Sequence, residues 1–257
     1  IRLKGFKIAD FEGNLNGDRF QAIHVPELHV QTSPRLTFSG TPEKISVRGE
    51  VLLPLLRVNG SQSQGPVESS PDLVREGKTK SGTGKPSVGL DVQVKLVLGE
   101  QAEFNAAGID AKLGGEMEIR FSDPERISGR GEIRVVKGRF RTYGVNLEIV
   151  RGHLFYAGGP VNQPALDILA IRKIGEVKAG VAVSGKLPKP LVKLYSEPYM
   201  QDMDILAYIV LGHPLGADSK QAGLLATAAG AVLTSQQAED LLEQIQDYLG
   251  LASLEIS

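Results

Sequence analysis

The chain has 257 residues, 41% of them hydrophobic, and it carries 29 Lys and Arg against 30 Asp and Glu. It is long enough to bury a sizeable core in one or two units. Its near-zero net charge gives no indication of nucleic acid or another polyanion as a partner.

Two further absences narrow the chemistry. There is no cysteine, which excludes disulfides and thiolate catalysis, and the four histidines lack metal-ligand spacing, which argues against structural zinc. We identify no signal peptide and no apolar run long enough to span a bilayer. The opening "IRLKGFKI" looks internal, so we expect a fragment of a longer protein.

Two regions precede the clearest strand signal. Residues 1–58 predict a β-strand region. Residues 59–87 are rich in Gly, Ser, Pro and charge, which predicts a flexible linker or loop. The "SGTGKPS" within it lacks one glycine of a phosphate loop, and its proline blocks the helix that should follow, so no nucleotide site is predicted.

Alternation of apolar and polar residues dominates residues 88–200. In "GLDVQVKLVLG" every second residue is apolar, which is typical of a half-buried strand. The alternation recurs around residues 115–121, 133–135, 145–149 and 177–183. Turn residues separate the runs: Asp123-Pro124, Gly138, Arg151-Gly152, Gly158-Gly159-Pro160 and Pro188. About ten short strands are therefore expected, in an extended antiparallel sheet, a sandwich or a solenoid-like structure.

An internal repeat favours stacked units. "PEKISVRGEV" (residues 42–51) matches "PERISGRGEI" (residues 124–133), and each copy follows a Phe-Ser pair. The aliphatic strand faces suit either a closed sandwich or a groove open to acyl chains. Large aromatic side chains to fill a sandwich are few, yet from the residues alone the sandwich is the favoured alternative.

Residues 201–250 predict a helical plug or cap. Asp202 is placed as an N-cap, and Gly212 with Pro214 ends the first helix. An apolar second helix is expected over 221–234 and an acidic amphipathic third over 238–249, which favours packing on protein over an anionic membrane. Residues 251–257 look like the start of a truncated strand. The expected cap residues are Ile205, Leu206, Ile209, Leu224, Leu225, Leu241, Leu242 and Ile245.

Charge is distributed unevenly along the chain. Residues 120–193 hold fourteen Lys and Arg against six Asp and Glu, whereas residues 194–257 hold one Lys against nine acids. Docking of the helical end on the strands and two separately solvated surfaces both explain this. No catalytic triad, carboxylate pair or cofactor loop is present, and His213 before Pro214 fits a helix end better than a base. The sequence predicts neither an enzyme nor a cofactor.

The stretch "LPKPLVKLYSEPYMQDMDILAYIVLGHPLG" resembles the C-terminal signature of the TamB family, which is related to AsmA-like proteins. A last strand ends at Leu194-Tyr195-Ser196-Glu197-Pro198. Met200 follows, and then a helix carries Asp202, Asp204 and Ile205-Leu206-Ala207-Tyr208, with Gly212 after it. Upstream, "GRFRTYGVNLEIVRGHLFYAGGPVNQPALDILAIR" is similar to a second family pattern, although Gln163 interrupts its Asn-Pro junction. The resemblance covers roughly residues 128–256.

The resemblance implies an elongated, taco-like β-sheet of mainly β structure in the periplasm of a diderm bacterium, with the full-length protein anchored in the inner membrane. It implies that phospholipid acyl chains move along an apolar groove toward the outer membrane. On this basis the expected lining residues are Leu90, Val92, Val94, Leu96, Leu98, Met117, Ile119, Ile133, Val135, Leu147, Ile149, Val181 and Val183.

The alternative implied function is a scaffold for outer-membrane protein insertion that works with an Omp85-type outer-membrane barrel and offers sheet edges to nascent strands. The strands that the family usually carries after this point are missing from the chain, which weakens the expectation that this piece binds the barrel. A closed spacer without ligand is the simplest remaining alternative.

Overall fold

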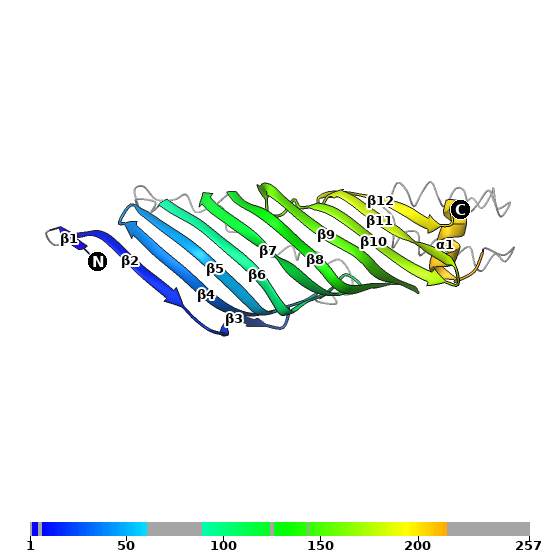
Figure 1. Cartoon of the computed structure of the whole chain (residues 1–257), viewed down its shortest axis with the longest axis horizontal. Helices are drawn as coiled ribbons and strands as arrows, with labels where there is room; N and C mark the ends of the chain where they lie inside the picture. Colours follow the sequence, from blue (N-terminus) through cyan, green and yellow to red (C-terminus); the bar gives the residue numbers. More distant parts are fainter. Residues whose placement is uncertain (1, 5–6, 61–88, 124–125, 143, 215–257) are drawn as a thin grey trace, which may run out of the picture.

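The computed structural model describes residues 2–4, 7–60, 89–123, 126–142 and 144–214. Within these ranges the chain forms one twelve-stranded sheet and one helix. The strands lie side by side in a long, gently twisted array, and the helix lies at the C-terminal end (Figure 1). The expected mainly β, elongated open sheet is confirmed, and the closed sandwich favoured by the residues alone is wrong.

The strand order follows the sequence almost throughout, as β1-β2-β4-β5-β6-β7-β8-β9-β10-β11-β12, with β3 beside β4. The first six strands are β1 (Arg2–Lys4), β2 (Lys7–Asn16), β3 (Phe20–Val25), β4 (Leu28–Thr41), β5 (Lys44–Asn59) and β6 (Gly89–Ala106). The last six are β7 (Ile109–Asp123), β8 (Arg126–Thr142), β9 (Val145–Pro160), β10 (Ala165–Ile174), β11 (Val177–Lys186) and β12 (Lys189–Glu197).

One strand pair departs from the expected antiparallel pattern. β5 and β6 are parallel, with Lys44 opposite Gly89 and Asn59 opposite Asn105. Every other pair in the sheet is antiparallel. Parallel neighbours need a connection that returns along the strand. The 59–87 segment, which we predicted as a linker, occupies this connection and lies almost wholly outside the described residues.

The strands are longer than expected, because β-bulges interrupt their alternation without ending them. The six strands β4–β9 have 14 to 18 residues each. Gly138 and Arg151-Gly152, which were expected to be turns, lie inside β8 and β9. At both glycines a Cβ would come within 3 Å of Val135 side-chain atoms. These glycines therefore permit close approach within a strand.

The register shifts line up into what we call the seam, a line of irregular pairing that crosses the sheet from β4 to β10. Shifts occur at residues 31–33, 53–55, 98–103, 112–113 and 169–170, and pairing between β8 and β9 is interrupted at the same level. Beside the seam, Ala102 is 0% exposed and Ala111 is 3% exposed. Bulges bend strands and increase their twist, so we expect the sheet to bend along the seam.

The sequence repeat corresponds to two equivalent hairpins, β4–β5 and β7–β8. Its shared glycine, Gly49 in one copy and Gly131 in the other, has φ near 140° in both. A Cβ at Gly131 would lie 2.4 Å from the Glu116 carbonyl oxygen on β7. The repeat therefore preserves a position where neighbouring backbones approach too closely for any side chain.

The expected division between residues 1–58 and 88–200 does not separate two sheets, since β5 and β6 join them. Of the expected cap over 201–250, the structure describes one helix, α1 (Asp202–Val210). Its N-cap is Gln201, without a side-chain hydrogen bond, so Asp202 is the first helical residue and not the cap. Gly212, at φ 86°, follows the helix as expected. The helices predicted at 221–234 and 238–249 and the strand at 251–257 lie outside the described residues.

Candidate functional site

One face of the sheet carries mostly apolar side chains along its whole length, and we call it the apolar face. The register places all thirteen predicted lining residues on this face. For example, Leu96 lies opposite Met117, Leu98 lies level with Ile133 across β7, and Val181 lies level with Ile149 across β10. Period-two alternation in each strand and in-register pairing between strands together produce this continuity. Whether the face holds lipid stays a prediction.

Burial of the apolar face varies along the sheet and is most extensive at the C-terminal end, beneath α1. At the N-terminal end, Phe20 is 62% exposed and Leu15 is 51% exposed. In the middle strands most of its side chains are half-buried, although Val94 is only 8% exposed. On β9, Leu147 is 1% exposed. The face is therefore accessible over most of its length and covered at one end.

The sequence did not single out the part of the apolar face formed by β3, β4 and β5. Register adds the side chains that face their apolar neighbours on these strands, including Ile23, Val30, Phe38, Val47 and Leu56. Proline, threonine and glycine interrupt the alternation in β4 and β5, so the period-two signal is weak there. Only their pairing with the clearly alternating strand β6 would have identified which side chains of these strands lie on the apolar face.

α1 covers the C-terminal end of the apolar face. Ile205, Leu206 and Ile209 are at most 3% exposed. Ile205 and Ile209 form a cluster with Val145, Leu147, Ala170, Ala179, Val181 and Val192 of β9–β12. These three cap residues lie where the sequence predicted a cap. Leu224, Leu225, Leu241, Leu242 and Ile245 lie outside the described residues.

A single arginine holds the C-terminus of α1. Arg172 of β10 lies opposite Ala179, on the apolar face, and its Nη1 donates hydrogen bonds to the carbonyl oxygens of Ile209 (2.9 Å) and Val210 (3.1 Å). These carbonyls belong to the last turn, where intrahelical partners are lacking and the helix dipole is negative. We did not predict this residue from the sequence, because its partners are backbone carbonyls that no residue pattern marks.

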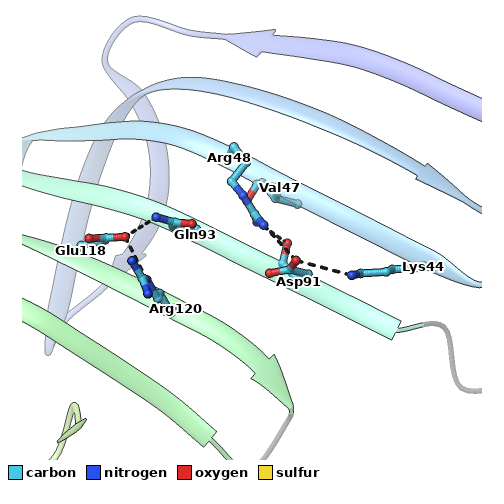
Figure 2. Close-up of polar contacts among 7 residues, drawn as sticks. All are labelled: Lys44, Val47, Arg48, Asp91, Gln93, Glu118 and Arg120. Carbon is cyan, nitrogen blue, oxygen red and sulfur yellow. Dashed lines mark hydrogen bonds and ion pairs between the residues drawn. The ribbon is translucent and has the colours of Figure 1, made fainter. Parts of the chain in front are cut away.

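The opposite face, the polar face, carries ion pairs and hydrogen bonds between charged and polar side chains, and Figure 2 shows those around Asp91 and Glu118. Arg48 of β5 contacts Asp91 of β6 at 2.9 Å, and Lys44 lies 3.7 Å from the same carboxylate. Glu118 of β7 accepts hydrogen bonds from Gln93 and from Arg120. Similar pairs join Lys95 to Glu116, Arg57 to Glu103 and Arg151 to Asp167. Because these side chains are exposed, the polar face is in contact with water. Exposed ion pairs of this kind contribute roughly 0–1 kcal/mol each to stability.

The titration of these pairs follows from their contacts. The hydrogen bond from Arg48 is the main cause that lowers the pKa of Asp91, and hydrogen bonds from Arg120 and Gln93 lower the pKa of Glu118. The hydrogen bond from Lys178 lowers the pKa of Glu197. Each partner favours the charged carboxylate, as expected for structural ion pairs on a strand surface.

A shallow hollow of about 950 Å³ lies on the polar face, with Arg48, Lys95, Glu116 and Arg134 among its lining residues. Most of its acidic groups pair with a neighbouring base, so it presents no obvious nucleophile or general base. The described residues include no cluster of three metal-ligating side chains. His213 is exposed and contacts the carbonyl of Pro214. Within the described part of the chain, no helix has the length and apolar character needed to cross a membrane.

Comparison with known proteins agrees with the architecture. The family model described as the TamB C-terminal domain matches residues 1–257. The translocation and assembly module subunit TamB of Haemophilus influenzae is 24% identical over 269 residues, an alignment that covers 95% of this chain and 20% of the relative. The chain thus spans about a fifth of the length of this curated relative. Because the family model matches the whole sequence, the chain belongs to the TamB family.

Proposed function

We propose that this chain is a section of a periplasmic bridge along which phospholipid acyl chains move over the apolar face between the inner and outer membranes. The observation that carries the proposal is the continuity of the apolar face. It runs in register from the β2–β3 end to β12, and the described residues cover it only at α1. A soluble sheet that leaves so much apolar surface half-exposed needs something apolar to cover it.

The energetics favour an acyl chain as that cover. Each methylene that leaves water gains about 0.8 kcal/mol before ordering costs. The surface is aliphatic, and the described part of the face offers few polar groups that would fix one lipid in one place. The total binding free energy of an acyl chain would therefore be large, but no single position on the face would hold it. Such binding lets the acyl chain slide along the face.

Family membership supports three further assignments. The relative's name describes a subunit of a translocation and assembly module. We extend this role to the present chain, with a periplasmic location, an inner-membrane anchor in the full-length protein and an Omp85-type outer-membrane barrel as partner. α1 and the residues after it would form the cap at the end of the lipid path. We assign no enzymatic activity.

Native mass spectrometry of the chain purified from cells, followed by lipid extraction, tests the proposal. We expect co-purified phospholipid that is lost on Val94→Asp while the far-ultraviolet spectrum of a β-sheet is kept. A stable chain that carries no lipid under gentle extraction would contradict lipid conduction.

A second function, the scaffold for outer-membrane protein insertion, is supported by β3. This strand pairs with β4 on one side only among the described residues, and Phe20 and Val25 are exposed. An exposed strand of this kind could receive a nascent strand by β-augmentation. Ala22→Pro, at a bulge position that lacks a registered partner on β4, should then impair assembly of outer-membrane proteins and leave lipid content unchanged.

A further inference from the structure

α1 occupies the same surface that the proposed lipid path uses. Its buried residues Ile205 and Ile209 lie over Ala170 and Ala179. Gly180 lies beneath the same region, and a Cβ there would come within 2.0 Å of the Ala170 carbonyl oxygen. The helix therefore fills the end of the apolar face with its own aliphatic side chains. An acyl chain that reached this end would have to displace α1.

Arg172 is a charged residue on an apolar surface, where it needs hydrogen-bond acceptors. Among the registered positions that β9–β12 present on the apolar face, it is the one charged residue. A guanidinium on an apolar surface is costly without hydrogen-bond acceptors. In the structure the carbonyls of Ile209 and Val210 supply them, at 2.9 and 3.1 Å.

The residue that follows the C-terminus of α1 leaves room for this contact. Gly212 follows the helix at φ 86°, and a Cβ there would lie 3.0 Å from Arg172 Nη2. A larger residue would be strained in this conformation and would crowd the guanidinium. When α1 lifts, Arg172 loses both acceptors and becomes a planar donor at the end of an apolar path. Phosphate oxygens are the acceptors that best match such a donor.

We infer that Arg172 exchanges partners, holding α1 on the apolar face when no lipid is present and binding the phosphate diester of a lipid headgroup when acyl chains displace α1. Arg172 would then act as the residue that makes this end of the path selective for phospholipid over uncharged lipid. This inference rests on the proposed function, because it requires acyl chains on the apolar face.

The test uses the whole 257-residue chain with one tryptophan introduced by Tyr208→Trp. The sequence contains no other tryptophan, and Tyr208 packs against the cluster beneath α1. Displacement of α1 should therefore shift the emission to the red. The probes are dihexanoyl phosphatidylglycerol and dihexanoylglycerol, which share acyl chains and differ in the phosphate-containing headgroup. Inorganic phosphate is the third probe.

We expect phosphatidylglycerol to displace α1 at a concentration about tenfold lower than dihexanoylglycerol, the ratio that corresponds to one charge-assisted hydrogen bond. Arg172→Met should abolish the difference, and Arg172→Lys should keep part of it. Lys173→Met is the matched control, since Lys173 is the exposed neighbour whose side chain lies on the polar face, and it should leave the ratio unchanged.

Three results would overturn the inference: the same ratio in Arg172→Met, equal effects of the two lipids on the parent, or displacement of α1 by inorganic phosphate alone. If Arg172→Met does not fold, Arg172→Lys with a ratio equal to the parent and to Lys173→Met would count against it as well. A second reporter separates the two proposals. Leu96→Trp on β6, far from α1 in the sheet, should be quenched by acyl-brominated phospholipid. Absence of this quenching would refute the lipid path itself.

Discussion

Replacing Val94 by Asp tests whether this part of the apolar face holds lipid. Val94 lies at the middle of β6 on the apolar face, opposite Gly49 and Ile119, and is 8% exposed. The substitution removes about 1.5–3 kcal/mol of apolar burial. In a closed core the carboxyl group would add roughly 1–3 kcal/mol of desolvation cost. Such a total would be a large fraction of the 5–15 kcal/mol that typically holds a domain together.

Val94 is itself 8% exposed, but its neighbours on the apolar face are half-buried, so we expect the carboxylate to turn toward water and the sheet to survive at reduced stability. Lipid binding also suffers, because the acyl methylenes near residue 94 lose their apolar surroundings. If about four methylenes are affected, the loss of about 3 kcal/mol corresponds to a fall in lipid occupancy of roughly 100-fold. Phospholipid per chain, measured by native mass spectrometry beside a urea unfolding curve, reports both quantities.

Val97→Asp is the matched control for this experiment. It lies three residues away on the same strand, but it faces Leu52 and Glu116 on the polar side. We expect Val97→Asp to keep both lipid and fold. Full lipid occupancy in Val94→Asp, or equal lipid loss in the two variants, would show that acyl chains do not lie against residue 94.

Three further predictions follow from single contacts. Gly131→Ala should cost about 1–3 kcal/mol of stability in urea unfolding because of its φ of 140°, whereas Gly159→Ala, with nothing within 4 Å, should be nearly neutral; equal effects would contradict this. Asp91→Asn should be less stable than wild type above the ordinary Asp pKa of 3.8, and the difference should shrink as the pH falls through the lower folded pKa that Arg48 produces; a constant difference in acid would argue against the ion pair. Ile209→Ala should weaken docking of α1 by about 2–5 kcal/mol, seen as faster amide exchange in residues 202–210 only; unchanged exchange there would show that the cluster does not hold the helix.

Strand identity and face were predictable where alternation is strong. In β6 the even positions from Leu90 to Leu98 are apolar without exception, and the structure places all five on one face. The parallel pairing of β5 with β6 was not predictable, because alternation determines which face a side chain occupies but not the direction of the neighbouring strand. Strand lengths were underestimated for a related reason. Glycine is typical of turns, so Gly138 and Gly152 were predicted as turn residues. In the structure they lie inside strands, where the Val135 side chain leaves no room for a Cβ.

The cap was predicted in part. Helical spacing of Ile205, Leu206 and Ile209 located α1 and its buried side, but the N-cap was displaced by one residue because Asp is a frequent cap and also a favourable first-turn residue. Arg172 was beyond sequence reasoning, since its partners are backbone carbonyls 37 and 38 residues away. Backbone acceptors leave no trace in residue type.

Site-specific photocrosslinking in cells tests whether acyl chains lie on the apolar face. The full-length protein would carry a benzoylphenylalanine at Leu96 or Ile119 on the apolar face, or at Gln93 or Arg120 on the polar face, with adducts identified by mass spectrometry. We expect phospholipid adducts at the first two positions and none at the other two. Adducts at both faces alike, or none at either apolar position, would contradict this expectation.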